Sequence, residues 1–263
     1  MFERIGELWL ERKAPPATGA AGRLLLVHGM WGGSWYWAHW LRRFAAGGWD
    51  TWAINLRGHH GSHPGTEVGG LGIDAYVTDV GRCVAALGDV AVIGHSMGGL
   101  LVQKLAAQTR LRAAVFLTSA PPRGIVALRG AAAARLWRYT GSLLTGRGFL
   151  PTPADARALL FNALSPDLAR DAYARLVPES GRAAREVALG VAVDAARVRC
   201  PVLVVGAGLD RIAPLAIQRR IATRYGGELR VWPGHAHLPM LEDGWEASAD
   251  ALLGWLGAVA PRP

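Results

Sequence analysis

The sequence predicts a doubly wound α/β domain with a mostly parallel sheet and a helical segment inserted between two of its core strands. Short, nearly continuous apolar runs alternate along most of the chain with segments whose apolar residues recur at helical spacing. Strands buried on both faces of a parallel sheet have this continuous apolar character, and alternating strands and helices are typical of doubly wound folds. The alternation stops between about residues 121 and 198, which marks the insertion.

The apolar runs place the strands in chain order. We expect a first strand near 8–10, followed by strands at 24–27, 51–56, 90–93, 113–117, 202–205 and 229–232. Most of these runs stop shortly before a glycine or proline, which interrupts regular structure. Segments of helical periodicity separate them, at about 35–46, 74–87, 97–109, 214–225 and 244–258.

The insertion is rich in alanine, arginine and leucine and contains no convincing strand. Glycine and proline divide it into helices expected at about 126–144, 153–163, 166–176 and 180–193. We therefore divide the chain into a core of residues 1–121 and 199–263 and an insertion of residues 122–198. Long insertions are usually functional, and ligands bind at the carboxyl ends of parallel strands, so we expect a lid over those ends. The alternative is a second structural subdomain that contacts no site.

Composition and charge exclude several classes of protein. The 263 residues are 51% apolar and 19% charged, which rules out a disordered or fibrous chain. The formal charge is +9, but the arginines are scattered rather than clustered in a stripe, so we expect no nucleic-acid partner. We expect no membrane span and no signal peptide, because no long uncharged apolar run is present. Two cysteines, Cys83 and Cys200, indicate reduced thiols and a cytoplasmic location.

The strongest chemical signal is the run Gly94–Gly99, with the sequence Gly-His-Ser-Met-Gly-Gly, between an expected strand and an expected helix. A Gly-x-Ser-x-Gly motif in this context places its serine on a sharp, strained turn. Gly94 and Gly98 have no Cβ, which lets the strand and the helix approach closely. The Ser96 hydroxyl would then lie above the edge of the sheet, at the positive end of a helix. The alternative is a tight turn with an incidental serine.

With this motif the chain resembles the α/β-hydrolase superfamily over nearly its whole length, apart from the insertion. The other matching motifs are Val27-His28-Gly29-Met30, Asn55-Leu56-Arg57-Gly58-His59, Gly208-Leu209-Asp210 and His237-Leu238-Pro239-Met240-Leu241-Glu242. The run from Val27 to Trp35 further resembles the branch of small esterases and hydroxynitrile lyases. The resemblance implies the α/β-hydrolase fold and a triad in the chain order of nucleophile, acid and histidine.

The resemblance assigns this triad to Ser96, Asp210 and His237. A serine hydroxyl needs an adjacent base, and the base needs an acid that holds its tautomer. Asp210 follows the strand expected at 202–205, where the family's acid lies, although it could instead cap the next helix. His235 and His237 both follow the last strand, and only the residues after His237 match the family's context. His235 would then be a loop residue or a support for the site.

Two backbone N–H groups are expected to stabilise the oxyanion that forms when the serine attacks a carbonyl group. One is the N–H of Met97, directly after the nucleophile. By resemblance the other is the N–H of Met30, in the loop after the strand at 24–27. His28 is expected to hold this loop through a structural hydrogen bond. Asn55 stands where many relatives have aspartate, so we expect the Arg57–His59 segment to fix its loop rather than to catalyse.

Aromatic residues near the site predict an apolar substrate pocket. Trp31 directly follows Met30, and the insertion contributes Trp137, Tyr139 and Phe161. A pocket with few polar groups would suit a hydrophobic acyl or alcohol group. A His-x-His pair at 235–237 could also bind a metal, but no matching acidic or cysteine ligands accompany it. We therefore expect no metal and no organic cofactor.

These inferences converge on a serine hydrolase that cleaves small to medium apolar carboxylic esters through an acyl-enzyme. Its partner would be a small-molecule ester. The same constellation also supports cofactor-free lyase, perhydrolase or lactonase chemistry, and a relative that only binds ligands would share the fold. All three triad residues are present, which counts against the binding-only alternative.

Overall fold

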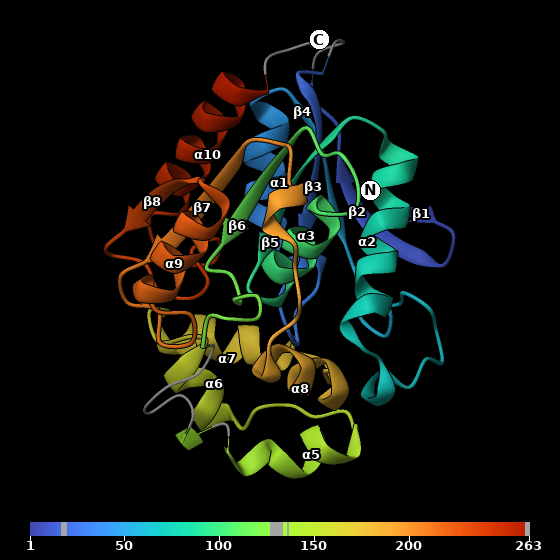
Figure 1. Cartoon of the computed structure of the whole chain (residues 1–263), viewed down its shortest axis with the longest axis vertical. Helices are drawn as coiled ribbons and strands as arrows, with labels where there is room; N and C mark the ends of the chain where they lie inside the picture. The colour runs from blue at the N-terminus through green and yellow to red at the C-terminus, as the bar shows by residue number, and fades with distance from the viewer. Residues whose placement is uncertain (17–19, 127–133, 136, 261–263) are drawn as a thin grey trace.

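The computed structural model describes residues 1–16, 20–126, 134–135 and 137–260. Its centre is an eight-stranded sheet over these residues, with the strand order β1-β2-β4-β3-β5-β6-β7-β8 (Figure 1). The strands are β1 (Phe2–Ile5), β2 (Leu8–Lys13), β3 (Gly22–Val27), β4 (Trp49–Ile54), β5 (Val90–His95), β6 (Ala113–Leu117), β7 (Val202–Ala207) and β8 (Glu228–Trp232). Strands β3 to β8 run parallel to one another, which confirms the predicted mostly parallel sheet.

The first strand of the sheet is one that the sequence did not predict. β1 pairs antiparallel with β2, and Gly6 turns the chain between them with a φ of 61°. β1 is a short edge strand with two charged residues among four, so it lacks the apolar run that marks the interior strands. β2 also extends beyond the predicted segment, to Lys13, and pairs antiparallel with β4.

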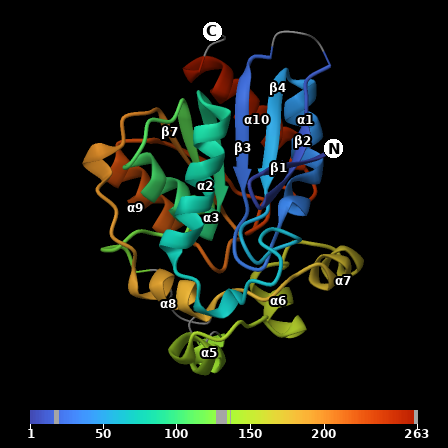
Figure 2. The same ribbon diagram turned by 90° about the vertical axis from the view of Figure 1, so that its right-hand side faces the viewer.

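Helices cover both faces of the sheet (Figure 2). α1 (Ala38–Ala46) and α10 (Trp245–Val259) cover one face, and α2 (Ile73–Leu87), α3 (Met97–Ala106) and α9 (Leu215–Tyr225) cover the other. Successive side chains of β3 point to opposite faces of the sheet. Leu24 and Leu26 pack on the side of α1 and α10, and Leu25 and Val27 pack on the side of α2, α3 and α9. This two-sided core confirms the doubly wound α/β fold. Short 3-10 helices also lie in the connections, among them η1 (Ser34–Trp37), η2 (Val68–Gly70) and η4 (Ala195–Arg197).

Between β6 and β7 the chain forms a layer of short helices beyond the carboxyl ends of the parallel strands (Figure 1). They are η3 (Trp137–Tyr139), α5 (Thr140–Thr145), α6 (Pro153–Leu159), α7 (Pro166–Ala174) and α8 (Gly181–Leu189). The last three begin within one residue of the predicted positions, because Thr152, Ser165 and Ser180 cap their N-termini by accepting backbone N–H bonds. No helix in the described part of the chain is long and apolar enough to cross a membrane.

The helix predicted at 126–144 needs correction. Residues 127–133 and 136 of that prediction lie outside the described residues. From Trp137 the chain makes a 3-10 turn before α5, and α5 ends at Thr145, where Gly146, with a φ of 68°, is the C-cap. The Thr140 hydroxyl donates to the Trp137 carbonyl oxygen at this turn, and such local bonds compete with a continuous helix.

Candidate active site

Ser96 lies at the tight turn where β5 ends and α3 begins. Its backbone has a φ of 54° and a ψ of −120°, a conformation that residues other than glycine rarely adopt. The strand and helix touch here because glycines leave room. A Cβ on Gly94 would lie 2.3 Å from Gly98 O, and a Cβ on Gly98 would lie 2.4 Å from Val27 O. The strand–turn–helix context expected for the serine is therefore present in the structure.

The strain at this turn predicts that Ser96→Gly is more stable than Ser96→Ala. Both variants lose the hydroxyl, but only glycine adopts a positive φ without steric cost. Such strain costs about 1–3 kcal/mol, and the greater freedom of glycine in the unfolded chain offsets part of its relief. We expect the free energy of unfolding of Ser96→Gly to be higher by about 1 kcal/mol, measured by urea denaturation. Equal stabilities of the two variants would show that the turn is not strained.

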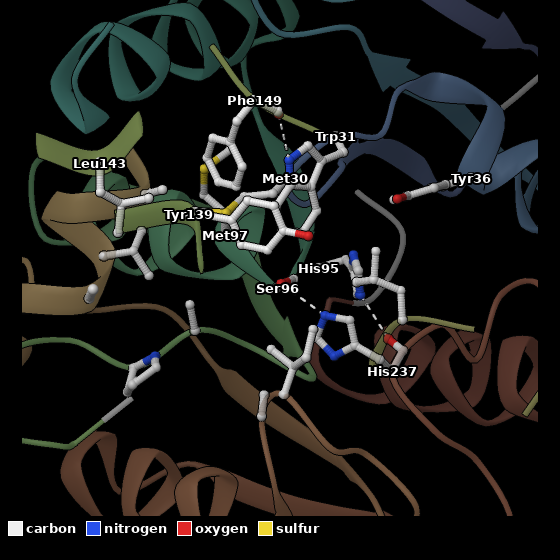
Figure 3. A pocket seen from close by; sticks show the side chains of 18 residues that line it. Met30, Trp31, Tyr36, His95, Ser96, Met97, Tyr139, Leu143, Phe149 and His237 are labelled. Atoms are coloured by element: carbon white, nitrogen blue, oxygen red, sulfur yellow. Dashed lines mark hydrogen bonds between the residues drawn. The ribbon is translucent and has the colours of Figure 1, made fainter. Parts of the chain in front are cut away.

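Ser96, His237 and Asp210 form one hydrogen-bonded chain. The Ser96 hydroxyl donates to His237 Nε2 over 3.0 Å (Figure 3), and His237 Nδ1–H donates to Asp210 Oδ2 over 2.8 Å. The imidazole and the carboxylate are both buried. A base within reach of the hydroxyl, with an acid on its other nitrogen, is the arrangement that activates a serine.

Asp210 is fixed by its loop as well as by His237. Its second oxygen, Oδ1, accepts the backbone N–H groups of Ile212 over 2.8 Å and Ala213 over 2.9 Å. The N-cap residue of α9 is Pro214, so the alternative role of Asp210 as the cap of that helix is wrong. The carboxylate is thereby held with one oxygen free to face the histidine.

His235 lies close to His237 in the chain but faces away from the serine. Its Nδ1–H donates to Glu242 Oε2 over 3.1 Å, and the Ser248 hydroxyl donates to its Nε2 over 3.0 Å. Glu242 also accepts the backbone N–H groups on both sides of His237 and so fixes the loop. Within the described residues, no group of three or more His, Cys, Asp or Glu side chains could hold a metal ion.

His95, the first of the two variable residues of the Gly-x-Ser-x-Gly motif, anchors the loop of His237. Its Nε2–H donates to the His237 carbonyl oxygen over 2.8 Å (Figure 3), and the Thr118 hydroxyl donates to the same oxygen. Burial, reinforced by the neighbouring His237, lowers the pKa of His95 well below its ordinary value. His95 is therefore a neutral donor, and it is a site residue that the sequence analysis left without a role.

Both residues predicted to supply oxyanion donors, Met30 and Met97, line the pocket beside Ser96 (Figure 3). Among the described residues, no acceptor pairs with either backbone N–H, which leaves both donors for a bound oxygen. The loop comes close because of Gly29, where a Cβ would lie 2.8 Å from Ser96 Cβ. The structural role predicted for His28 is confirmed, since its Nε2 accepts the Leu56 N–H and its Nδ1–H donates to Gly29 O.

The pocket above the serine lies between the core and the insertion (Figure 3). It contains about 880 Å³ of empty space, part of it open to solvent. The insertion supplies about half of the apolar residues that line it, namely Tyr139, Leu143, Phe149, Leu160, Ala184, Val187 and Ala188. No Asp, Glu, Lys or Arg is among the described residues that line it. The site therefore combines a polar reacting end with an apolar, uncharged interior.

Two of the four residues predicted for the substrate pocket lie at this cavity. Trp31 and Tyr139 line the pocket, whereas Trp137 and Phe161 do not. Trp137 is 76% exposed, and Phe161 is buried in the hydrophobic core that the insertion shares with one face of the sheet. The sequence marks all four as aromatic but carries no signal for the direction in which each one points. Tyr36, from η1, lines the pocket and was missed for the same reason.

The sequence of the chain matches a known protein family, and its fold matches solved structures. A sequence model of the alpha/beta hydrolase family matches residues 24–251. No curated protein sequence matches the chain significantly. A hydrolase from Pseudomonas aeruginosa PA01 has a TM-score of 0.73 and 22% identity, covering 95% of this chain and 94% of that chain. A thermophilic esterase from Thermogutta terrifontis has a TM-score of 0.73 and 21% identity, covering 96% and 94%. At these identities the likeness shows the fold.

Proposed function

The chain belongs to the α/β-hydrolase family, and from this premise we propose that it is a serine hydrolase that cleaves uncharged, small to medium-sized carboxylic esters through an acyl-enzyme. The observation that carries the proposal is the hydrogen-bonded chain from Ser96 through His237 to Asp210 beneath an apolar pocket. This arrangement makes a nucleophile of a serine hydroxyl. The likeness in fold to the Thermogutta terrifontis esterase supports an ester as the substrate.

In the acylation step, Ser96 Oγ attacks the ester carbonyl carbon while His237 Nε2 takes the hydroxyl proton. Asp210 keeps the other proton on His237 Nδ1 and stabilises the imidazolium. The carbonyl oxygen becomes an oxyanion that accepts hydrogen bonds from the N–H groups of Met30 and Met97. His237 returns the proton to the leaving alcohol. Water, activated by His237, then attacks the acyl-enzyme, releases the acid and restores Ser96.

In this proposal the insertion, residues 122–198, acts as a lid that selects the substrate. Its side chains, among them Leu143 and Phe149, form the apolar wall opposite the serine. A charged acyl group would lose its hydration there without gaining an ion partner from the described residues of the lining, which costs several kcal/mol. The pocket therefore favours neutral, hydrophobic acyl or alcohol groups.

The proposal is tested with p-nitrophenyl esters of increasing acyl length and with covalent labelling by a fluorophosphonate. We expect labelling and turnover, with kcat/KM rising roughly fourfold per methylene, or about 0.8 kcal/mol, until the acyl chain fills the pocket. A p-nitrophenyl hemisuccinate is the matched control, because its acyl chain ends in a carboxylate and should be a poor substrate.

Folded protein that is neither labelled nor active would contradict the serine hydrolase. Labelling without turnover of any ester would contradict the ester substrate, and lactones and cyanohydrins would then be assayed. Equal turnover of the hemisuccinate and a neutral ester of the same length would contradict the preference for uncharged substrates.

A further inference from the structure

A carboxylate of the insertion is buried in the core directly behind the oxyanion loop, residues 28–31. Glu179 precedes α8 and is fully buried. Its Oε1 accepts the Tyr76 hydroxyl over 2.6 Å and the Ser180 N–H over 2.7 Å. Its Oε2 accepts the Trp31 N–H over 3.3 Å and lies 3.3 Å from His59 Nε2. One side chain thus joins the insertion to the oxyanion loop, to α2 and to the loop after β4.

Glu179 and His59 form a buried ion pair. Burial opposes the charge on each, but the attraction between them and the surrounding hydrogen bonds outweigh it. The pKa of Glu179 therefore lies below its ordinary value, and the pKa of His59 lies above its ordinary value. His59 Nδ1–H donates to the Arg57 carbonyl oxygen over 3.0 Å, which fixes the ring. Removing one partner of such a pair leaves a buried charge alone, so the pair holds the two parts of the chain in one arrangement.

The oxyanion loop needs this support because its backbone is strained. Trp31 has a φ of 62°, which a bulky residue rarely adopts. Three hydrogen bonds from the insertion hold it there. Its N–H donates to Glu179, its carbonyl oxygen accepts the Val177 N–H over 3.0 Å, and its indole N–H donates to Phe149 O over 3.1 Å (Figure 3). Strained backbone persists only where its surroundings impose it.

We propose that Glu179 is a positioning residue through which the insertion sets the oxyanion hole. By holding the Trp31 N–H, it keeps the loop in the conformation that aims the N–H of the preceding residue, Met30, at the substrate oxygen. The inference rests on the proposed serine hydrolase function. It gives the insertion a role beyond covering the pocket, because the core alone would not complete the catalytic site.

The exchange Glu179→Gln removes the negative charge of the ion pair with His59 but can keep most hydrogen bonds of the side chain. The amide oxygen can replace Oε1, where the two short hydrogen bonds are made, and the NH₂ group can donate to a neutral His59. The NH₂ group cannot accept the Trp31 N–H, so this bond is lost. Loss of one oxyanion donor costs about 10²–10³ in kcat, and we expect a fall of about 10²-fold. KM should not change, because the donor acts mainly in the transition state.

Glu186→Gln is the matched control. Glu186 lies on α8 and its carboxylate also accepts a core backbone N–H, from Ile73 over 2.7 Å, but it does not touch the oxyanion loop. We expect its kcat and KM to equal those of the wild type. Active sites are counted by titration to completion with a fluorophosphonate, and kcat is expressed per titrated site. Unfolded molecules are then not counted, which separates a positioning role from a loss of stability.

A fall of kcat per site in Glu179→Gln alone supports the proposal. Wild-type kcat per site in Glu179→Gln, or equal losses in both variants, would overturn it. If Glu179→Gln does not fold, Glu179→Asp is measured instead and is judged by the same two outcomes. Aspartate keeps the negative charge, but its side chain is shorter by one methylene, so its carboxylate no longer reaches the Trp31 N–H. A wild-type protein that is neither labelled nor active refutes the serine hydrolase itself, and the positioning role falls with it.

Discussion

Ser96→Ala should abolish ester turnover, lowering kcat by about 10⁶-fold, because no other group near the bound ester replaces the nucleophile. What remains is the acceleration that the oxyanion donors and the pocket supply without covalent chemistry, about 10³–10⁴ over the reaction in water. The change removes one oxygen atom and one hydrogen bond, to His237. The variant should therefore remain folded, and kcat is measured with the best p-nitrophenyl ester of the series.

Ser119→Ala is the control for this exchange. Ser119 is buried and follows the neighbouring strand β6, and its hydroxyl, like that of Ser96, is hydrogen-bonded, but it does not line the pocket. We expect its kcat to stay close to that of the wild type. Turnover by Ser96→Ala at the level of Ser119→Ala would mean that the serine hydrolysis mechanism is wrong.

Asp210→Asn should lower kcat by about 10⁴-fold while the loop around it stays in place. The asparagine oxygen can keep the two N–H bonds that Oδ1 accepts from Ile212 and Ala213. Its NH₂ group then faces His237 Nδ1 and donates to it. The proton of the imidazole moves to Nε2, which can no longer accept the proton of Ser96.

The matched control for this prediction is Asp194→Asn. Asp194 makes the same kind of local bond, because its Oδ1 accepts the Ala196 N–H over 3.1 Å, but it contacts no histidine. Its kcat should equal that of the wild type, and thermal unfolding should show all three proteins folded. If Asp210→Asn kept wild-type kcat, Asp210 would not be the acid of the triad.

The sequence was sufficient for those parts of the molecule whose signal is local. Interior strands bury both faces, so their apolar runs are continuous and can be recognised in the sequence. β1 is an edge strand with charged residues, and it has no such run. The turn at Ser96 needs glycines at fixed spacing, and this spacing is present in the chain as well as in the structure. In the sequence, only the family context distinguished His237 from His235. In the structure, both ring nitrogens of His235 are hydrogen-bonded to Glu242 and Ser248, so His235 is not the base.

The parts that the sequence did not predict depend on packing between distant segments. Trp137 and Tyr139 are two residues apart, yet one is exposed and the other lines the pocket, because a 3-10 turn presents them in different directions. Glu179 is one of several acidic residues in the insertion, and nothing in its sequence neighbourhood marks it as buried. Its partners Trp31, His59 and Tyr76 lie more than one hundred residues earlier in the chain.

The attachment of Glu179 to the core has a consequence for the exchange of parts between relatives. A chimera that receives a foreign segment in place of residues 122–198 gains a new pocket wall, but it also receives a foreign support for Trp31. If Glu179 has the proposed positioning role, such an exchange changes substrate range and catalytic rate together. A productive graft must retain Glu179, or supply a carboxylate at that place, in a host that carries the equivalents of His59 and Tyr76.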